Sequence, residues 1–299
     1  MQSISRRRLA RAACLAAVGL AGAIVVAAEK IGPQQPWSSF KVHDMTRPAP
    51  PVVTPGTFST PEQPGKPPSD AIVLFDGKDL SQWEAVDGAA LARGKGVGEG
   101  EPTFKVEDGV ALSYGPKYME TKEKFGDVQL HLEWAEPTPP KGDSQGRGNS
   151  GVFLMGRFET QVLDSFNNPT YPDGQCGAIY GQYPPQVNAC RPPGEWQVYD
   201  IIFHHPRYEG DKLVEPAYIT TIQNGVLLQD HQRIEGPTAH MRVASYPEND
   251  KLESGPIALQ YHGNPVRYRN IWVRPLEALQ EQQHSGKVPD AAEKPAEQK

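Results

Sequence analysis

Two carboxylates and an amide follow a short glycine-containing segment near the middle of the chain. The segment is Asn149-Ser150-Gly151-Val152-Phe153-Leu154, and the polar side chains after it are Glu159, Gln161 and Asp164. In a strand, Glu159 and Gln161 point to one face, and Asp164 joins them only if a bulged residue shifts the alternation. Such a set suits acid–base chemistry on a polyhydroxylated ligand such as a sugar. The alternative is a solvated strand face with Asp164 opening a turn.

The spacing is similar to that of jelly-roll glucanases that retain anomeric configuration. Those enzymes carry a Glu-x-Asp-x-x-Glu strand whose first and last carboxylates act as nucleophile and acid. In this chain the pattern reads Glu159-x-Gln161-x-x-Asp164, so an amide replaces the central acid and the last acid is shorter.

The N-terminus has the features of an export signal. Four arginines between positions 6 and 11 precede an apolar run, residues 14–26, that ends at small residues. This run is shorter than the roughly 20 residues of a membrane-spanning helix, so we expect cleavage after residue 28 and no stable membrane span afterwards. Residues 5–9 also resemble a twin-arginine signal. We therefore expect a periplasmic or secreted protein.

The charge of the chain argues against a nucleic-acid partner. The formal net charge is −6, and removal of residues 1–28 takes away four arginines and no acids, which gives −10. Nucleic-acid binding needs a basic surface, and no stripe of lysine and arginine is present. A glycoside or oligosaccharide fits this composition better.

The central part of the chain reads as one all-β domain. Residues 29–69 hold ten prolines and are expected to form an extended tether, whereas residues 277–299 are expected to be a disordered tail. Between them, residues 70–276 contain short alternating runs, of which Asp127–Trp134 is the clearest. Asp-Gly and Asn-Gly pairs separate several runs and predict tight hairpin turns. These features predict an antiparallel sandwich or jelly roll.

A long irregular segment, Ser165–Glu195, is expected to form a wall of a ligand cleft. It carries Tyr180, and Trp196 follows it, and both are candidate surfaces for stacking against a sugar. It also contains Cys176 and Cys190, which either form a disulfide in an oxidising compartment or remain buried thiols.

The ordered motifs of residues 70–276 resemble the 3-keto-disaccharide hydrolase domain family. The matching pieces include Leu74-Phe75-Asp76-Gly77-Lys78, Asn149-Ser150-Gly151-Val152-Phe153, Gly177-Ala178-Ile179-Tyr180-Gly181 and Leu259-Gln260-Tyr261-His262-Gly263. The resemblance implies a fold of the concanavalin A-like lectin and glucanase type and activity on glycosides oxidised at C3. A C3 ketone acidifies the C2 hydrogen, so a base can form an enolate and the C1 substituent can leave by β-elimination, after which water adds.

Such a reaction requires a base, a proton donor and groups that hold the enolate oxygen. We assign the catalytic roles to Glu159, Asp164 and His262, with His262 as proton shuttle or metal ligand. A satisfied histidine beside a glycine turn is the alternative for His262, and a structural salt bridge is the alternative for Arg269. The expected substrate-binding residues are Asn149, Gln161, Gln260, Arg269, Glu133, Tyr180 and Trp196.

Metal dependence stays open at the level of sequence. A carboxylate and His262 would suit a divalent ion, either calcium or a transition metal, but no standard ligand spacing is present. Two other classes of function also remain: a conventional glucanase-like glycoside hydrolase, and a carbohydrate-binding domain without catalysis.

Overall fold

The chain forms a sandwich of antiparallel sheets in the computed structural model, which describes residues 32–91, 98, 100–248 and 251–276. There are two compact units, Met1–Pro48 and Ala49–Lys299, and the sandwich belongs to the second. In the first unit, an isolated bridge pairs Gln34 with Lys41. The predicted export signal and C-terminal tail lie outside the described residues. Within the described part, no helix is both long and apolar enough to cross a membrane.

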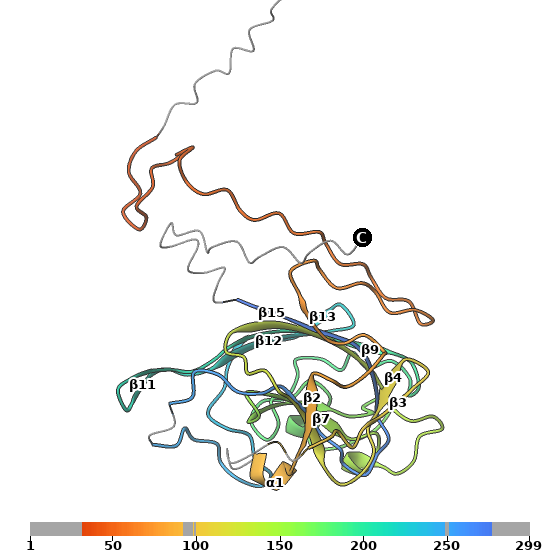
Figure 1. Cartoon of the computed structure of the whole chain (residues 1–299). Coiled ribbons are helices and arrows are strands. Elements are labelled where there is room, and N and C mark those ends of the chain that lie inside the picture. Colours follow the sequence, from red (N-terminus) through yellow and green to blue (C-terminus); the bar gives the residue numbers. More distant parts are fainter. Residues whose placement is uncertain (1–31, 92–97, 99, 249–250, 277–299) are drawn as a thin grey trace, which may run out of the picture. The chain divides into compact units, whose positions relative to one another are not determined.

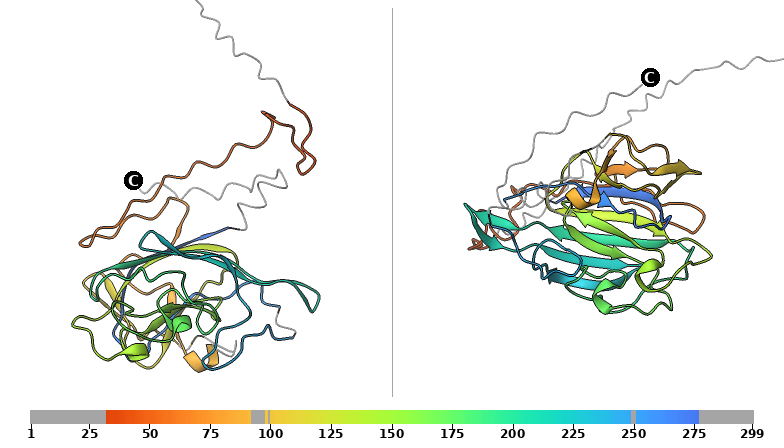
Figure 2. Two further views of the ribbon diagram at one scale, coloured as in Figure 1. Left: turned by 180° about the vertical axis from the view of Figure 1, so that it is seen from behind. Right: turned by 90° about the horizontal axis from the view of Figure 1, so that it is seen from below.

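The larger sheet has eight strands and arches over the smaller one (Figure 1, and from behind in Figure 2). Its order is β13-β12-β9-β6-β15-β4-β3, and β1 also pairs with β15. The bounds are β1 Ile72–Phe75, β3 Lys105–Glu107, β4 Val110–Leu112, β6 Val128–Ala135, β9 Gln197–His204, β12 Tyr218–Gln223, β13 Val226–Arg233 and β15 Arg267–Pro275.

The smaller sheet has the order β2-β5-β14-β7-β8. Its strands are β2 Trp83–Val86, β5 Tyr118–Thr121, β14 Ala258–Leu259, β7 Ser150–Leu154 and β8 Phe158–Val162. A separate hairpin joins β10 Arg207–Glu209 to β11 Lys212–Glu215. The helical elements are α1 Gly88–Leu91 and the 3-10 turns Ser144–Gly146 and Pro172–Gly174. The all-β, jelly-roll class predicted from the sequence is therefore confirmed.

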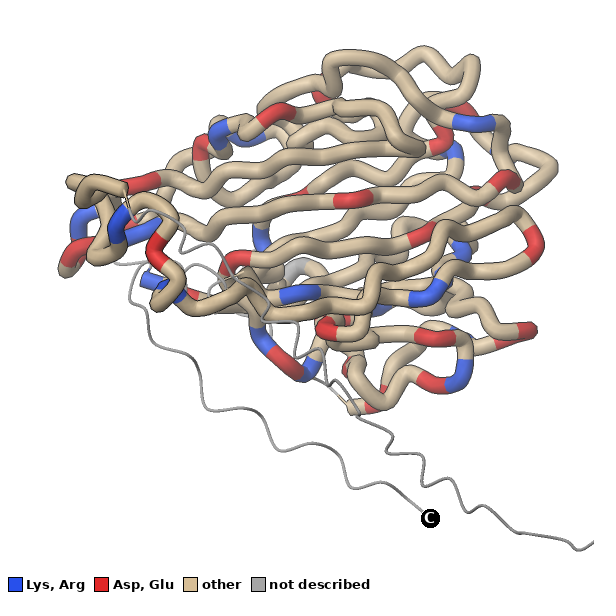
Figure 3. Tube along the Cα trace, turned by 90° about the horizontal axis from the view of Figure 1, so that it is seen from above, with Lys and Arg blue, Asp and Glu red and all other residues tan. Residues whose placement is uncertain are grey.

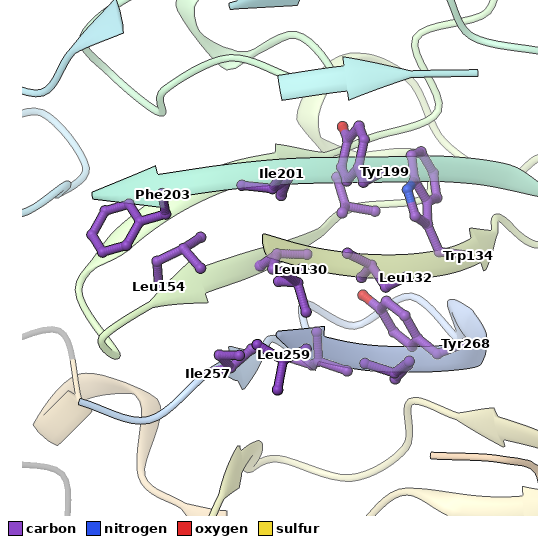
Figure 4. Packing of buried hydrophobic residues seen from close by; sticks show 14 of the residues in the cluster. Leu130, Leu132, Trp134, Leu154, Tyr199, Ile201, Phe203, Ile257, Leu259 and Tyr268 are labelled. Carbon is purple, nitrogen blue, oxygen red and sulfur yellow. The ribbon is translucent and has the colours of Figure 1, made fainter. Parts of the chain in front are cut away.

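The core lies between the two sheets. On β6, the four alternating side chains that the sequence pattern assigns to the core are at most 1 % exposed: Val128, Leu130, Leu132 and Trp134. They pack with residues of the same sheet and with Leu154 and Leu259 of the smaller sheet (Figure 4). Each such buried side chain contributes about 1.5–3 kcal/mol of transfer free energy, which makes this shared layer the main force holding the sheets together.

Local turn chemistry fixes two of the hairpins. Asp108 and Gly109 join β3 to β4 with φ angles of 49° and 77°, and Asn224 and Gly225 join β12 to β13 with 52° and 81°. Positive φ at both central residues is the geometry in which Asp-Gly and Asn-Gly pairs are favoured. The sequence prediction of tight turns at these positions is confirmed.

Part of the predicted tether packs against the domain instead of extending freely. The Oγ of Ser59 donates a hydrogen bond to the Glu133 carboxylate on β6. Arg269 on β15 donates to the carbonyl oxygens of Thr60 and Pro61 at 2.6 and 3.1 Å. A proline-rich segment cannot build a core of its own, but its free carbonyl groups can bind polar side chains that a sheet presents.

Candidate active site

Glu159 points away from the core on the outer face of the five-stranded sheet. Phe158 and Val162 belong to the core cluster, so strand alternation places Glu159 and Gln161 on the opposite face, as the sequence predicted. Strands β7 and β8 pair in one continuous register, and β8 ends before Asp164. The ladder between β7 and β8 therefore contains no bulge of the kind expected to bring Asp164 onto this face.

Gly151 on β7 makes room for the Glu159 carboxyl group. It pairs with Gln161 on the neighbouring strand, and a Cβ atom at position 151 would lie 2.3 Å from Oε1 of Glu159. Two heavy atoms cannot approach this closely without a bond. The carboxyl group therefore occupies the space that any other side chain would fill, which explains the glycine in the Asn-Ser-Gly motif.

Replacing Gly151 with alanine should abolish most activity by displacing Glu159 while keeping the fold. Gly146→Ala is the matched control, because a Cβ at that position meets no atom within 4 Å. Comparing turnover and thermal unfolding of the two variants tests this. Turnover by Gly151→Ala equal to that of the Gly146→Ala control would contradict the position assigned to Glu159.

A chain of amides holds one side of the Glu159 carboxyl group. Nε2 of Gln161 donates to Oε1 of Gln145 at 3.0 Å, and the other terminal atom of the Gln161 amide lies 3.2 Å from Oε1 of Glu159. The Gln145 oxygen also accepts from Nδ2 of Asn149 at 3.3 Å. Gln145 itself is anchored through Nε2 to the carbonyl oxygen of Gly174 at 2.9 Å. Two predicted residues, Asn149 and Gln161, thus lie together, and Gln145 joins them.

Gln260 flanks the glycine on the other side, and its amide contacts the phenol of Tyr118. The backbone N–H of Gln260 donates to the carbonyl oxygen of Gly151 at 3.0 Å, and Nε2 of Gln260 donates to Oη of Tyr118 at 2.6 Å. Because the Tyr118 oxygen accepts this bond, its own proton remains available to a ligand. Oε1 of Gln260 is buried and has no hydrogen-bond partner in the described part of the chain. It is therefore an acceptor that a sugar hydroxyl would satisfy.

Tyr180 lies beside the strand that carries Glu159 and contacts two further rings. The backbone N–H of Tyr180 donates to the carbonyl oxygen of Glu159 at 3.2 Å, which fixes Tyr180 beside the strand. Oη of Tyr180 lies 3.0 Å from Oη of Tyr171 and 2.9 Å from Nδ1 of His240. Tyr171 and His240 are exposed. The polar atoms of the three rings thus link Tyr180 to two exposed side chains, and the sugar-stacking role of Tyr180 stays a prediction.

Burial sets the electrostatics of the site. The Glu159 residue is 7 % exposed, and this desolvation raises the pKa of its carboxyl group from 4.5 to about 8. Burial also raises the pKa of Tyr118, and the Glu159 charge adds to that rise while the hydrogen bond from Gln260 opposes it. A carboxyl group that titrates near pH 8 is both a stronger base than usual and a proton donor at neutral pH.

Asp164 is engaged elsewhere. Its two carboxylate oxygens accept hydrogen bonds from Nε and Nη2 of Arg147 at 2.7 and 2.9 Å, and one also accepts from the N–H of Phe166 at 3.1 Å. The Asp164 side chain is 1 % exposed. This bidentate ion pair joins the loop before β7 to the end of β8, so the structure gives Asp164 a structural contact rather than the role of catalytic partner.

Asp164→Asn should therefore lower the free energy of unfolding by about 2 kcal/mol, because it weakens two charge-assisted hydrogen bonds, and should change kcat little. Urea unfolding and initial rates measure the two effects. A large loss of kcat in a fully stable Asp164→Asn protein would restore Asp164 to the catalytic set.

Glu133 and Arg269 lie on the larger sheet, whereas His262 follows Gln260 by two residues. His262 is exposed in the loop between β14 and β15. Glu133 and Arg269 are paired on the larger sheet, with Nε of Arg269 2.7 Å from Oε2 of Glu133, and the Arg269 guanidinium lies 4.1 Å from the centre of the Trp196 ring. For Arg269 the salt-bridge alternative is thus the one the structure shows. Sequence alternation alone does not reveal which of two sheets a strand joins.

Cys176 and Cys190 are free thiols rather than a disulfide; Cys176 is buried, as the alternative expected, whereas Cys190 is partly exposed. They are neighbours, and Oη of Tyr199 lies 2.8 Å from Sγ of Cys176.

For a metal ion, the described residues contain no group of three or more histidine, cysteine, aspartate or glutamate side chains placed to bind one. The neighbours of Glu159 are amides and phenols, which do not match the usual ligand set.

Comparison with known proteins decides the family. Residues 70–274 match the family described as the 3-keto-alpha-glucoside-1,2-lyase-like domain. The chain belongs to this family. The prediction made from the sequence motifs is confirmed. No curated protein matched the chain.

Of the similar solved structures, one supports the fold. A protein of Parabacteroides distasonis named as a candidate glycosyl hydrolase is 46% identical, with a TM-score of 0.68 over 77% of this chain and 93% of that one. A second protein of that name and organism is 21% identical with a TM-score of 0.48, over 70% of this chain and 94% of that one. An alginate lyase variant bound to an alginate tetrasaccharide is 11% identical, with a TM-score of 0.38 over 69% of this chain and 97% of that one. Together with the family match, the similarity to the 46% identical protein makes this protein a carbohydrate-active enzyme.

Proposed function

We propose that this member of the family is an exported enzyme that cleaves 3-keto-glycosides by deprotonation at C2, β-elimination and hydration. The observation that carries the proposal is the buried carboxyl group of Glu159, placed over Gly151 and next to the Gln161 amide, with Gln260 on the other side of the glycine and Tyr118 bonded to Gln260. The family description and the signal-like N-terminus support the reaction and the periplasmic or secreted location.

The spacing of carboxylates argues against a conventional glucanase mechanism. Glu120 shares a row with Glu159 across β5, β14, β7 and β8, with Ala258 and Phe153 between them. Neighbouring strands lie about 4.8 Å apart, so the three strand-to-strand steps separate the backbones of Glu120 and Glu159 by roughly 14 Å. Displacement at a sugar carbon needs carboxylates about 5–5.5 Å apart for retention or 6.5–9.5 Å for inversion. A β-elimination needs no such pair.

The side chains around Gly151 can carry each proton of the reaction. Ionised Glu159 takes the C2 proton, and the resulting enolate expels the C1 oxygen, which takes the proton of Tyr118. The amides of Gln161 and Gln260 lie where they can bind the C3 oxygen and neighbouring hydroxyl groups. Water then adds its hydroxide to C1, Glu159 gives C2 a proton after its carboxyl group has exchanged with solvent, and the other water proton restores Tyr118. The net result is hydrolysis.

Incubation of residues 29–299 with a 3-keto-glucoside and its unoxidised parent tests the proposal. We expect aglycone release from the keto sugar alone, with and without a chelator, and deuterium at C2 of the product in D2O. Release from the parent would favour a displacement mechanism, and release from neither would favour a binding domain without catalysis. Loss of activity with chelator would instead place a metal ion in the role of enolate stabiliser.

A further inference from the structure

A cavity lies on the outer face of the larger sheet, and Glu159 does not line it. Its volume is about 990 Å³, which is ample for an oligosaccharide. The floor includes His131 and Glu133 of β6 and Trp272 of β15, and Trp196 contributes to a wall. The roof is the segment 56–61, which precedes the part of the chain that matches the family.

The roof is held in place by hydrogen bonds. Ser59 Oγ donates to Glu133 and accepts from the N–H of Gly65 at 2.5 Å, while Arg269 donates to the carbonyl oxygens of Thr60 and Pro61. The N–H of Thr57 also donates to the carbonyl oxygen of Lys66 at 2.9 Å. The cavity is therefore preformed, so a ligand would not have to order its walls.

The charges in the floor are paired with one another. Glu133 binds Arg269, and Nδ1 of His131 lies 2.7 Å from Oδ1 of Asp200. Hydrogen bonds from His131, Ser59, Asn270 and Arg269 outweigh burial and lower the pKa of Glu133 to about 2. The domain seen from this side also shows acidic and basic residues interspersed (Figure 3). A neutral ligand fits these paired charges better than an ion.

The roof also holds an apolar ring that no other side chain among the described residues covers. Phe58 in the roof is 101% exposed although it lines the cavity. In the floor, the ring of Trp272 stacks on His131 with centroids 4.9 Å apart. Exposed aromatic rings beside fixed polar groups suit a ligand with C–H faces and hydroxyl groups, because each part of the ligand finds a partner.

We infer that this cavity is a second, non-catalytic site for a neutral oligosaccharide, roofed by Phe58 and separate from the site of Glu159. It would hold the glycan while the other sheet performs the chemistry, and it does not depend on which reaction occurs there.

The test uses Glu159→Gln protein, residues 29–299, titrated with cellotetraose and maltotetraose and followed by tryptophan fluorescence. Trp196 and Trp272 line this cavity, so they report binding there. Phe58→Ala, added to that protein, should weaken binding by roughly tenfold, the effect of losing one aromatic anchor. Val52→Ala is the matched control, because Val52 is 99% exposed and does not line the cavity.

Because both replaced side chains are fully exposed, neither change should affect folding. A fluorescence change that Phe58→Ala weakens and Val52→Ala preserves supports the site. No fluorescence change with either sugar up to about 10 mM, or a change that Phe58→Ala leaves intact, overturns it. Failure of the keto-sugar assay would leave this result unaffected, so the two proposals are tested separately.

Discussion

Replacing Glu159 with glutamine should lower kcat on a 3-keto-glucoside by roughly 10²- to 10⁴-fold, the usual contribution of a general base. Glutamine keeps the size of the side chain over Gly151 but cannot accept the C2 proton. KM should change little, because the amides and the Tyr118 phenol remain in place. Turnover within a few-fold of the wild-type value would remove Glu159 from the mechanism.

The same substitution should stabilise the protein above neutral pH. The folded pKa of Glu159, about 8, exceeds the ordinary value of 4.5, so the folded state binds this proton more tightly than the unfolded state. The carboxyl group therefore favours folding least at high pH, and its contribution declines as pH rises from 4.5 to about 8. Glutamine has no such penalty, so Glu159→Gln should exceed wild type in urea midpoint at pH 9 and match it more closely at pH 5.

The pH profile separates the base role from an acid role. If ionised Glu159 removes the C2 proton, kcat on the keto sugar should rise with pH and level off above about 8. A profile that falls across this range would show that the protonated form acts, which would make Glu159 the donor to the leaving group.

Arg269→Met should lower the free energy of unfolding by about 3–5 kcal/mol, the cost of leaving a buried charge without its partner. The side chains of Arg269 and Glu133 are 6% and 0% exposed, and Arg269 also holds the carbonyl oxygens of Thr60 and Pro61. The substitution thus removes a charge pair and the attachment of the roof segment together. Urea unfolding at pH 7 measures the loss.

Arg267→Met is the matched control, because Arg267 lies on the same strand and also contacts Trp196, at 5.3 Å, but donates to the carbonyl oxygen of Gly194. Its loss should cost about 1 kcal/mol. An equal loss of unfolding free energy in both variants would mean that the ion pair between Arg269 and Glu133 adds no stability beyond that of an ordinary hydrogen bond. In the wild-type protein, the stabilisation from Glu133 should be present above pH 4.5 and decline as pH falls toward its folded pKa of about 2.

Local sequence patterns were sufficient to predict the strands, the hairpin turns and part of the candidate site. The alternation of Asp127–Trp134 predicted a strand with a buried face, and the Asp108-Gly109 and Asn224-Gly225 pairs predicted hairpins, because these preferences depend on a few adjacent residues. The pairing of Glu159 with Gln161 on one face follows from two-residue alternation in the same way. Motif order identified the family.

The tertiary structure decided which of these residues meet. Tyr118 lies on β5, Gly151 on β7 and Gln260 directly after β14, and only the strand order β5-β14-β7-β8 brings them to the part of the sheet that carries Glu159. Strand order also put Glu133 and Arg269 on the other sheet. The sequence by itself determined strands, turns and family, since those depend on neighbours along the chain. Sheet membership, the burial that shifts the Glu159 pKa, and the packing of segment 56–61 on β6 and β15 depend on long-range contacts, which no local pattern specifies.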